Sequence, residues 1–198
     1  MPSLTTTVKD TSPLLIYTGN WKPGNSVNDP LVNRYLESSF SFTQGIGESM
    51  TFQFYGSFVE VVGAKRRNHG DYTVKTDSQT LTGNGFSDSE IFNATLFSQT
   101  LDLGQHTLVA TNVGDNGGQF FDIDYVTFRS DVGEADEPLI VNTFQDSHPS
   151  FNFSPPSSWG DQINVFPGTS GRATSDLSAS AKFSFQGVSP TENVLADI

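Results

Sequence analysis

Short runs of alternating hydrophobic and polar residues, separated by clusters of Gly, Asn, Asp, Ser and Pro, fill most of this chain. Helical periodicity is almost absent. Side chains of a strand point alternately to its two faces, so such runs predict half-buried β-strands. The clearest run is Ser49–Tyr55, in which Met50, Phe52 and Phe54 share one face, and Asp71–Thr76 alternates in the same way. The pattern is typical of an all-β sandwich.

The same signals place the other elements. Further strands are expected at Leu14–Thr18, Arg34–Thr43, Phe58–Val62, Ile91–Leu101, His106–Thr111 and Phe120–Phe128. Breaker residues predict loops at Trp21–Asp29, Lys65–Gly70, Thr80–Glu90 and Val113–Gln119, with turns at Gly56 and Leu103–Gln105.

The strand Phe120–Phe128 carries the most informative pattern. Its aromatic and aliphatic side chains alternate with the carboxylates of Asp122 and Asp124, which share one face. At about 3.3 Å per residue these two carboxylates lie roughly 7 Å apart. An isolated buried charge is too costly to keep, so each must be hydrogen-bonded, paired or bound to a cation.

Composition narrows the function. The 198 residues include 17 Phe and no Cys, which allows an aromatic core but no disulfide, thiolate nucleophile or Cys-based zinc site. A net charge of −12 argues against nucleic-acid binding, which needs a basic face. No apolar run is long enough for membrane insertion. The first ten residues lack the apolar core of a signal peptide, so we expect either a cytoplasmic chain or a trimmed start.

The sequence partly repeats itself after an acidic stretch, DVGEADE. Asp10–Pro13, Tyr17, Trp21 and Thr51–Gly56 are echoed in the same order by Asp146–Pro149, Phe153, Trp159 and Lys182–Gly187. We therefore predict an N-terminal tail at 1–11, a complete sandwich at 12–130, an acidic linker at 131–138 and a partial second copy at 139–198. Half a sandwich exposes sheet edges, so this copy is either a truncated second domain or a set of strands that completes itself against the first domain or against another chain, as in a homo-oligomer.

Several motifs in order carry a resemblance to a known family. They are Tyr17 with Trp21, the F-x-F-x-G of 52–56, Gly70–Val74, Leu103–Leu108 and Phe121–Val126. Together they resemble galactose-binding-domain-like β-sandwiches, and more narrowly the tandem modules of uncharacterised secreted or membrane-anchored proteins of mushroom-forming fungi. The resemblance covers about residues 10–130 and the first half of a second module. It implies a jelly-roll sandwich, carbohydrate binding, and a place outside the cell or at its surface.

The closing strand also resembles that of carbohydrate-binding modules in which an aspartate of this strand helps to hold structural calcium. In those modules the aspartate pairs with glutamates near the N-terminus, where this chain has only Asp10. Asp122 and Asp124 are thus candidate calcium ligands through their oxygens. The alternative is that both accept hydrogen bonds from loop amides and steady the Gly-rich 113–119 turn.

Candidate ligand-binding residues are Trp21, Arg66, Asn68, His69 and Tyr72. Tryptophan offers a large face for a sugar ring, and guanidinium suits bidentate capture of a carboxylate or sulfate. The structural alternatives are that Trp21 and Tyr72 belong to the core and that the loop around Arg66 is simply solvated.

We expect a non-catalytic, lectin-like module that binds a glycan or polysaccharide. One alternative is a structural or adhesive protein that self-associates. Another is a glycoside hydrolase that uses Asp122 and Asp124, whose spacing fits such a pair but whose position on one sheet face is not a cleft.

Overall fold

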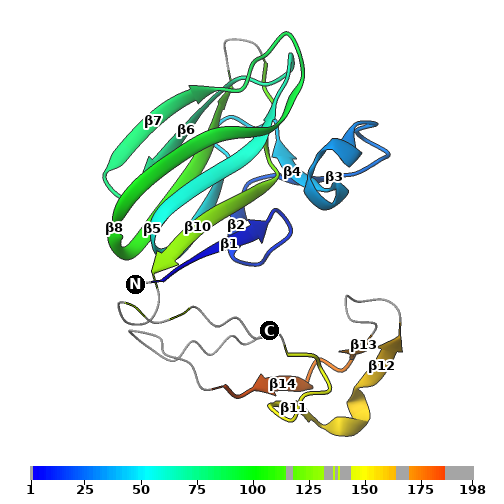
Figure 1. Ribbon diagram of the computed structural model, residues 1–198. Coiled ribbons are helices and arrows are strands. Elements are labelled where there is room, and N and C mark those ends of the chain that lie inside the picture. The colour runs from blue at the N-terminus through cyan, green and yellow to red at the C-terminus, as the bar shows by residue number, and fades with distance from the viewer. Residues whose placement is uncertain are drawn as a thin grey trace. The chain divides into compact units, whose positions relative to one another are not determined.

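The computed structural model describes residues 2–114, 118–131, 136, 138, 144–163 and 170–185 (Figure 1). The chain forms two compact units, one spanning Ser3–Asp131 and the other beginning at Val132. Helical structure among these residues amounts to short 3-10 turns, at Val32–Arg34, Leu36–Ser38 and Pro156–Ser158. None of the described helices is long and apolar enough to cross a bilayer.

The first unit is an antiparallel β-sandwich. Its larger sheet has the order β1-β10-β5-β8-β6-β7, with β2 also paired to β5. The strands are β1 Ser3–Lys9, β2 Leu15–Thr18, β5 Ser49–Lys65, β6 Asp71–Thr76, β7 Gln79–Asn84, β8 Ile91–Gly114 and β10 Tyr125–Asp131. A smaller sheet of order β3-β4-β9 contains Lys22–Gly24, Phe40–Thr43 and Phe121–Ile123.

The long strands β5 and β8 bend together, and this closes the sandwich. Tyr72 pairs with Asn112 of β8, yet its hydroxyl donates to the carbonyl of Leu96 at 2.6 Å. A straight strand would separate those two β8 residues by about 50 Å. The register of the β5–β8 ladder shifts between Gly56 and Phe58. A Cβ on Gly56 would lie 2.4 Å from a main-chain oxygen of β10, so only glycine fits there.

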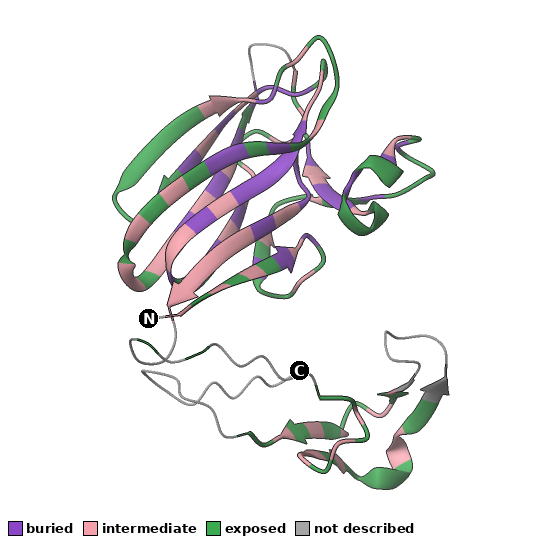
Figure 2. Cartoon of the chain, in the orientation of Figure 1, coloured by how far each residue is buried: buried purple, intermediate pink, exposed green. Residues whose placement is uncertain are grey.

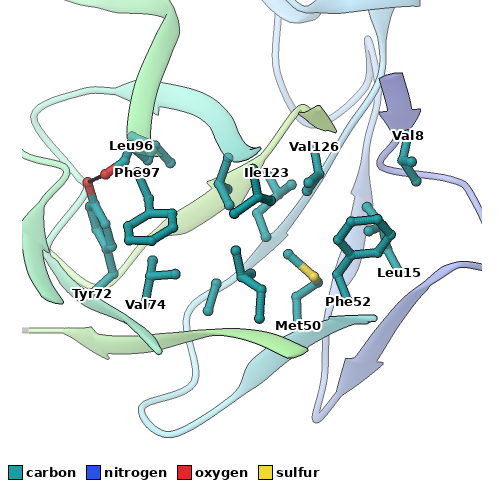
Figure 3. Packing of buried hydrophobic residues seen from close by; sticks show 14 of the residues in the cluster. Val8, Leu15, Met50, Phe52, Tyr72, Val74, Leu96, Phe97, Ile123 and Val126 are labelled. Carbon is teal, nitrogen blue, oxygen red and sulfur yellow. Dashed lines mark hydrogen bonds between the residues drawn. The ribbon is translucent and has the colours of Figure 1, made fainter. Parts of the chain in front are cut away.

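The core is enclosed by this folded sheet and includes side chains of β9 from the smaller sheet. Met50, Phe52, Val74, Ile123 and Val126 are each at most 1% exposed and pack together (Figure 3). Buried residues alternate with less buried ones along most of β5 and β6, and in β8 they lie in two stretches on either side of its middle, whereas β7 at the sheet edge is exposed along most of its length (Figure 2). The sequence prediction of an all-β sandwich is therefore confirmed.

Individual elements differ from the sequence expectations where tertiary pairing decides. Residues expected to be a tail form β1, part of the loop expected at Thr80–Glu90 forms β7, and Lys22–Gly24 forms β3. The strand expected at Arg34–Thr43 starts only at Phe40, and the turn expected at Leu103–Gln105 lies within continuous β8. Edge strands such as β1 and β7 carry few buried side chains, so their alternation is weak in the sequence.

The described part of the second unit contains two separate strand pairs. They are β11 Phe151–Ser154 with β14 Ser180–Phe183, and β12 Gly160–Ile163 with β13 Ser170–Ala173. Phe153 pairs with Ala181 in the first of these ladders, and its ring lies 4.9 Å from that of Trp159. Most of the acidic linker expected at 131–138 lies outside the described residues.

Candidate functional site

A pocket of about 160 Å³ lies in the first unit, where loops meet strands β4 and β9. It is called the loop pocket below. Side chains that line it include Asp29, Phe42, Arg66, Asn68, His69 and Phe120. They come from the loop before the first 3-10 turn, from β4, from the loop after β5 and from the entry to β9. The pocket therefore combines segments that are far apart in the sequence.

An aromatic platform forms part of its lining. The rings of Phe42 and Phe120 stack with centroids 5.7 Å apart and an interplanar angle of 28°. The His69 ring continues the plate, 6.1 Å from Phe120 at 27°. Phe42 and Phe120 are partly exposed, whereas His69 is 3% exposed. The platform thus offers two accessible phenyl groups and a buried imidazole behind them.

Main-chain pairing holds the 66–70 loop against the entry to β9. The amide of Phe120 donates to the carbonyl of Asn68 at 3.0 Å, and the amide of Gly70 donates to the carbonyl of Phe120 at 3.2 Å. A Cβ on Gly118 would lie 2.0 Å from the Asn68 carbonyl oxygen. The two segments can approach this closely only because residue 118 is glycine.

The guanidinium of Arg66 is already paired with carboxylates of the protein. Its guanidinium pairs with Asp29 and, at 3.2 Å, with Glu90, and it lies 5.5 Å from the centroid of the Phe92 ring. Burial lowers the pKa of Arg66, but the hydrogen bond to Asp29 contributes to a net rise, so the group stays a fixed cation. Its charge is thereby largely neutralised at the pocket.

Asp122 collects three donors and is 1% exposed. It accepts hydrogen bonds from the Tyr35 hydroxyl at 2.6 Å and the Ala64 amide at 2.7 Å, and it lies 2.9 Å from Nε2 of His69. Burial and the Asp122 carboxylate raise the pKa of Tyr35, which keeps its hydroxyl protonated and able to donate. Asp122 therefore joins the segments that carry Tyr35, Ala64 and His69 beneath the surface of the pocket.

Asp124 has a separate set of partners. Its carboxylate accepts from the Lys9 ammonium at 2.7 Å and from the Leu36 amide at 3.0 Å. Burial raises the pKa of Asp124, and these hydrogen bonds oppose the rise. As the residues stand, Asp122 and Asp124 do not fit a calcium ion, because protein donors occupy both carboxylates. Among the described residues, no group of three or more His, Cys, Asp or Glu side chains is placed to hold a metal.

The loop-amide alternative for these two carboxylates is correct only in part. The amides that they accept belong to Ala64 and Leu36, not to the Gly-rich 113–119 turn. The ends of that turn are instead held by Asn112, whose side-chain amide donates to the carbonyls of Gly45 and Gln119.

The structure brings Arg66, Asn68 and His69 together but not the other two candidates. Trp21 packs against the core between Tyr17 and Phe121, and its ring centroid lies 4.8 Å from that of Tyr17 and 5.9 Å from that of Phe121. Its Nε1 is buried with no hydrogen-bond partner among the described residues. Trp21 thus belongs to the core, as the structural alternative has it, and the same holds for Tyr72.

Tyr72 is 2% exposed, and burial raises its pKa to about 12. It borders a different hollow, of about 330 Å³, that lies over β6, β7 and β8. Its hydroxyl is bonded to Leu96, as described above, so it is not a free polar group there.

Sequence reasoning missed Asp29, Phe42 and Phe120 as members of the pocket. Phe42 alternates with Phe40, which signals a strand face but not which end of the sandwich that strand reaches. Asp29 sits in a loop rich in breakers and carries no motif. Tertiary contacts join these segments: β4 pairs with β9, which sets Phe42 opposite Asp122, and Arg66 pairs with Asp29.

Comparison with known proteins finds similarity in structure alone. No protein-family model matches this chain, and no curated protein does. Similar solved structures include a family two carbohydrate esterase from Cellvibrio japonicus, at 13% identity and a TM-score of 0.47, covering 66% of this chain. This chain spans 35% of the length of that esterase.

Two further solved structures are carbohydrate-binding modules. The CBM36-1 domain of a multidomain xylanase from the hindgut metagenome of Trinervitermes trinervoides is 21% identical, with a TM-score of 0.42, covering 66% of this chain and 100% of that domain. A CBM36 module in complex with calcium and xylotriose is 11% identical, with a TM-score of 0.41, covering 63% of this chain and 99% of the module. The likeness concerns the β-sandwich fold.

Proposed function

We propose that the first unit is a non-catalytic carbohydrate-binding module and that the loop pocket is its ligand site. The observation that carries this proposal is the aromatic platform of Phe42 and Phe120, rimmed by the polar groups of Asn68, Asp29 and Arg66. The C–H face of a sugar packs on an aromatic ring, and its hydroxyls need convergent hydrogen-bonding groups.

The dimensions of the pocket favour a single sugar ring. Its volume of about 160 Å³ is below the roughly 300–1,000 Å³ of sites for drug-sized ligands. We therefore expect one ring, or the end of a chain, to enter while the rest of the glycan stays outside.

The charges of the pocket favour a neutral sugar. Arg66 is paired with two carboxylates, and the chain carries a net charge of −12. An acidic sugar would have to compete with Asp29 for the guanidinium and would enter a negative field. This proposal replaces the expectation that the 65–69 loop captures a carboxylate or sulfate.

A binding role is proposed rather than hydrolysis because of how the acidic groups are used. A glycosidase needs one carboxyl group as an acid and another as a base or nucleophile. In the loop pocket, Asp122 is saturated by three donors and Asp29 is paired with Arg66. A module that binds polymeric glycans would act outside the cell or at its surface, and we propose that location.

The test is a glycan array with the purified chain, followed by calorimetric titration of the best neutral ligand. Phe42→Ala and Phe120→Ala should each weaken binding about tenfold, since one phenyl face of roughly 50 Å² is worth about 1.3 kcal/mol. Tyr55→Ala is the matched control, because Tyr55 is 38% exposed and does not line the pocket.

Two outcomes would contradict the proposal. One is the absence of binding to every glycan, with the fold intact by circular dichroism. The other is binding that Phe42→Ala and Phe120→Ala leave unchanged, which would move the ligand site elsewhere on the sandwich. Turnover of glycosides that disappears in Asp122→Asn would favour an enzyme instead.

Self-association is a second candidate function, and one observation favours it. In the second unit the rings of Phe144, Phe151, Phe183 and Phe185 form a chain of aromatic contacts, yet Phe185 is 60% and Phe144 is 39% exposed. None of the residues whose burial is described in 144–185 is fully buried. Such an exposed aromatic row is stabilised when a second copy of the chain packs on it and removes it from water. A strict monomer by light scattering at high concentration would count against this function.

A further inference from the structure

The Lys9 ammonium sits in a cage of oxygen atoms that lies outside the loop pocket. Nζ is 2.7 Å from Asp10 Oδ1, 2.7 Å from the Ser39 carbonyl oxygen, 2.8 Å from the Asp124 carbonyl oxygen and 2.7 Å from Asp124 Oδ1. The Lys9 side chain is 12% exposed, and those of Asp10 and Asp124 are 1% exposed. The contacts join the end of β1, the approach to β4 and the junction between β9 and β10.

This cage has the character of a cation site. An ammonium has three hydrogens to donate, yet four oxygens lie within 2.8 Å of Nζ. Asp124 contributes both its main-chain and its side-chain oxygen, as a chelating ligand does. Carboxylate and carbonyl oxygens are the ligands that hard divalent cations prefer.

The surrounding groups fix these oxygens. The hydroxyls of Ser39 and Ser41 donate to the Asp10 carboxylate at 2.8 and 3.1 Å. The Asp10 amide donates to the Asp124 carbonyl at 3.0 Å. Two buried carboxylates around one ammonium leave a local charge of −1, and a divalent ion in its place would leave zero.

We propose that the Lys9 ammonium is the built-in structural cation of this sandwich, so that the fold needs no metal here, and that its removal opens a site for a divalent cation such as Ca²⁺. Asp124 does not fit a calcium ion in this chain because a side chain from β1 fills the position. The cation role of Lys9 is independent of the proposed glycan binding.

The test compares melting temperatures with millimolar Ca²⁺ and with chelator. Wild type should melt at the same temperature in both. Lys9→Ala should melt about 10 °C lower in chelator, because it leaves two buried carboxylates without their cation. Millimolar Ca²⁺ should then recover several degrees of that loss.

Two control variants separate the causes. Lys9→Met keeps the apolar stem and fills the space, so it should be destabilised like Lys9→Ala but should not respond to Ca²⁺. Lys75→Ala removes an exposed lysine of β6 and should match wild type in both conditions.

Three results would overturn the proposal. They are stabilisation of wild type by Ca²⁺, a Lys9→Ala variant as stable as wild type, and a Lys9→Ala variant indifferent to Ca²⁺. If Lys9→Ala fails to fold in chelator, the same comparison is made on refolding yield, and a yield that Ca²⁺ does not raise overturns the proposal as well.

Discussion

Replacing Asp122 with Asn tests whether this carboxylate holds the loop pocket together. The side chain keeps its size but loses its charge and one of its two acceptor oxygens. If the amide oxygen stays at the Oδ1 position, Tyr35 and His69 lose their acceptor; if it takes the Oδ2 position, the Ala64 amide does. At least one buried donor is then left without a partner in either orientation.

The expected loss of stability follows from these contacts. A hydrogen bond to a charged group contributes about 1.5–3 kcal/mol, and burial makes an unmade one costly. We expect Asp122→Asn to lower the free energy of unfolding by about 2–4 kcal/mol and Asp122→Ala by about 3–5 kcal/mol. The urea m-value should stay unchanged, because the surface exposed on unfolding is the same.

The assay is urea unfolding followed by tryptophan fluorescence in a Trp159→Phe background. Trp21 is then the sole tryptophan, and it packs against the core of the first unit. The matched control is Asp88→Ala, whose side chain is 80% exposed and lies 3.6 Å from Arg67. That change should cost less than about 0.5 kcal/mol. An Asp122→Asn variant as stable as the Asp88→Ala control would refute the role assigned to Asp122.

Three further predictions concern other parts of the first unit. His106 is hydrogen-bonded to Asp77 at 2.7 Å; burial lowers its pKa, but the bonds to Asp77 and the Asp102 carbonyl leave it above its ordinary value of 6.5. The stability that this histidine adds is fully present below pH 6.5 and is lost as the pH rises through its folded pKa, so wild-type melting curves measured from acid to mildly alkaline pH should show a decline that Asp77→Asn reduces. Gly118→Ala should cost at least about 1–3 kcal/mol and weaken glycan binding, because the new Cβ meets the Asn68 carbonyl; unfolding and titration equal to wild type would contradict this. Tyr72→Phe removes the hydroxyl bond to the Leu96 carbonyl across the sandwich and should cost about 1–1.5 kcal/mol in urea, with an unchanged midpoint as the contrary result.

The buried strands of the sandwich were predictable from the sequence. Ser49–Tyr55 and Asp71–Thr76 alternate because one face of each packs in the core, and the structure places strands there. The loop at 66–70 was also predictable as a loop, since its polar residues are consecutive and lie between strands. Local periodicity and turn chemistry record what happens within a few residues.

The edge strands and the bend were not predictable in this way. β7 is exposed over most of its length, so nothing in its side chains distinguishes it from a loop, and its strand form depends on pairing with β6. The bend of β5 and β8 requires glycine at position 56 because β10 passes close by. A sequence read along one strand does not contain the position of that neighbour.

For Asp122 and Asp124, too, one part of the chemistry follows from the local sequence and another part from the fold. The residue types of this strand are enough to require that Asp122 and Asp124 be compensated, because charge among aromatic residues is costly to bury. The fold sets which groups compensate them: Tyr35, Ala64 and His69 for Asp122, and the ammonium of Lys9 for Asp124. These partners lie between 53 and 115 residues away in the chain. The need for compensation is a local property of the strand, whereas the identity of the compensating group depends on which distant segment the fold brings beside it.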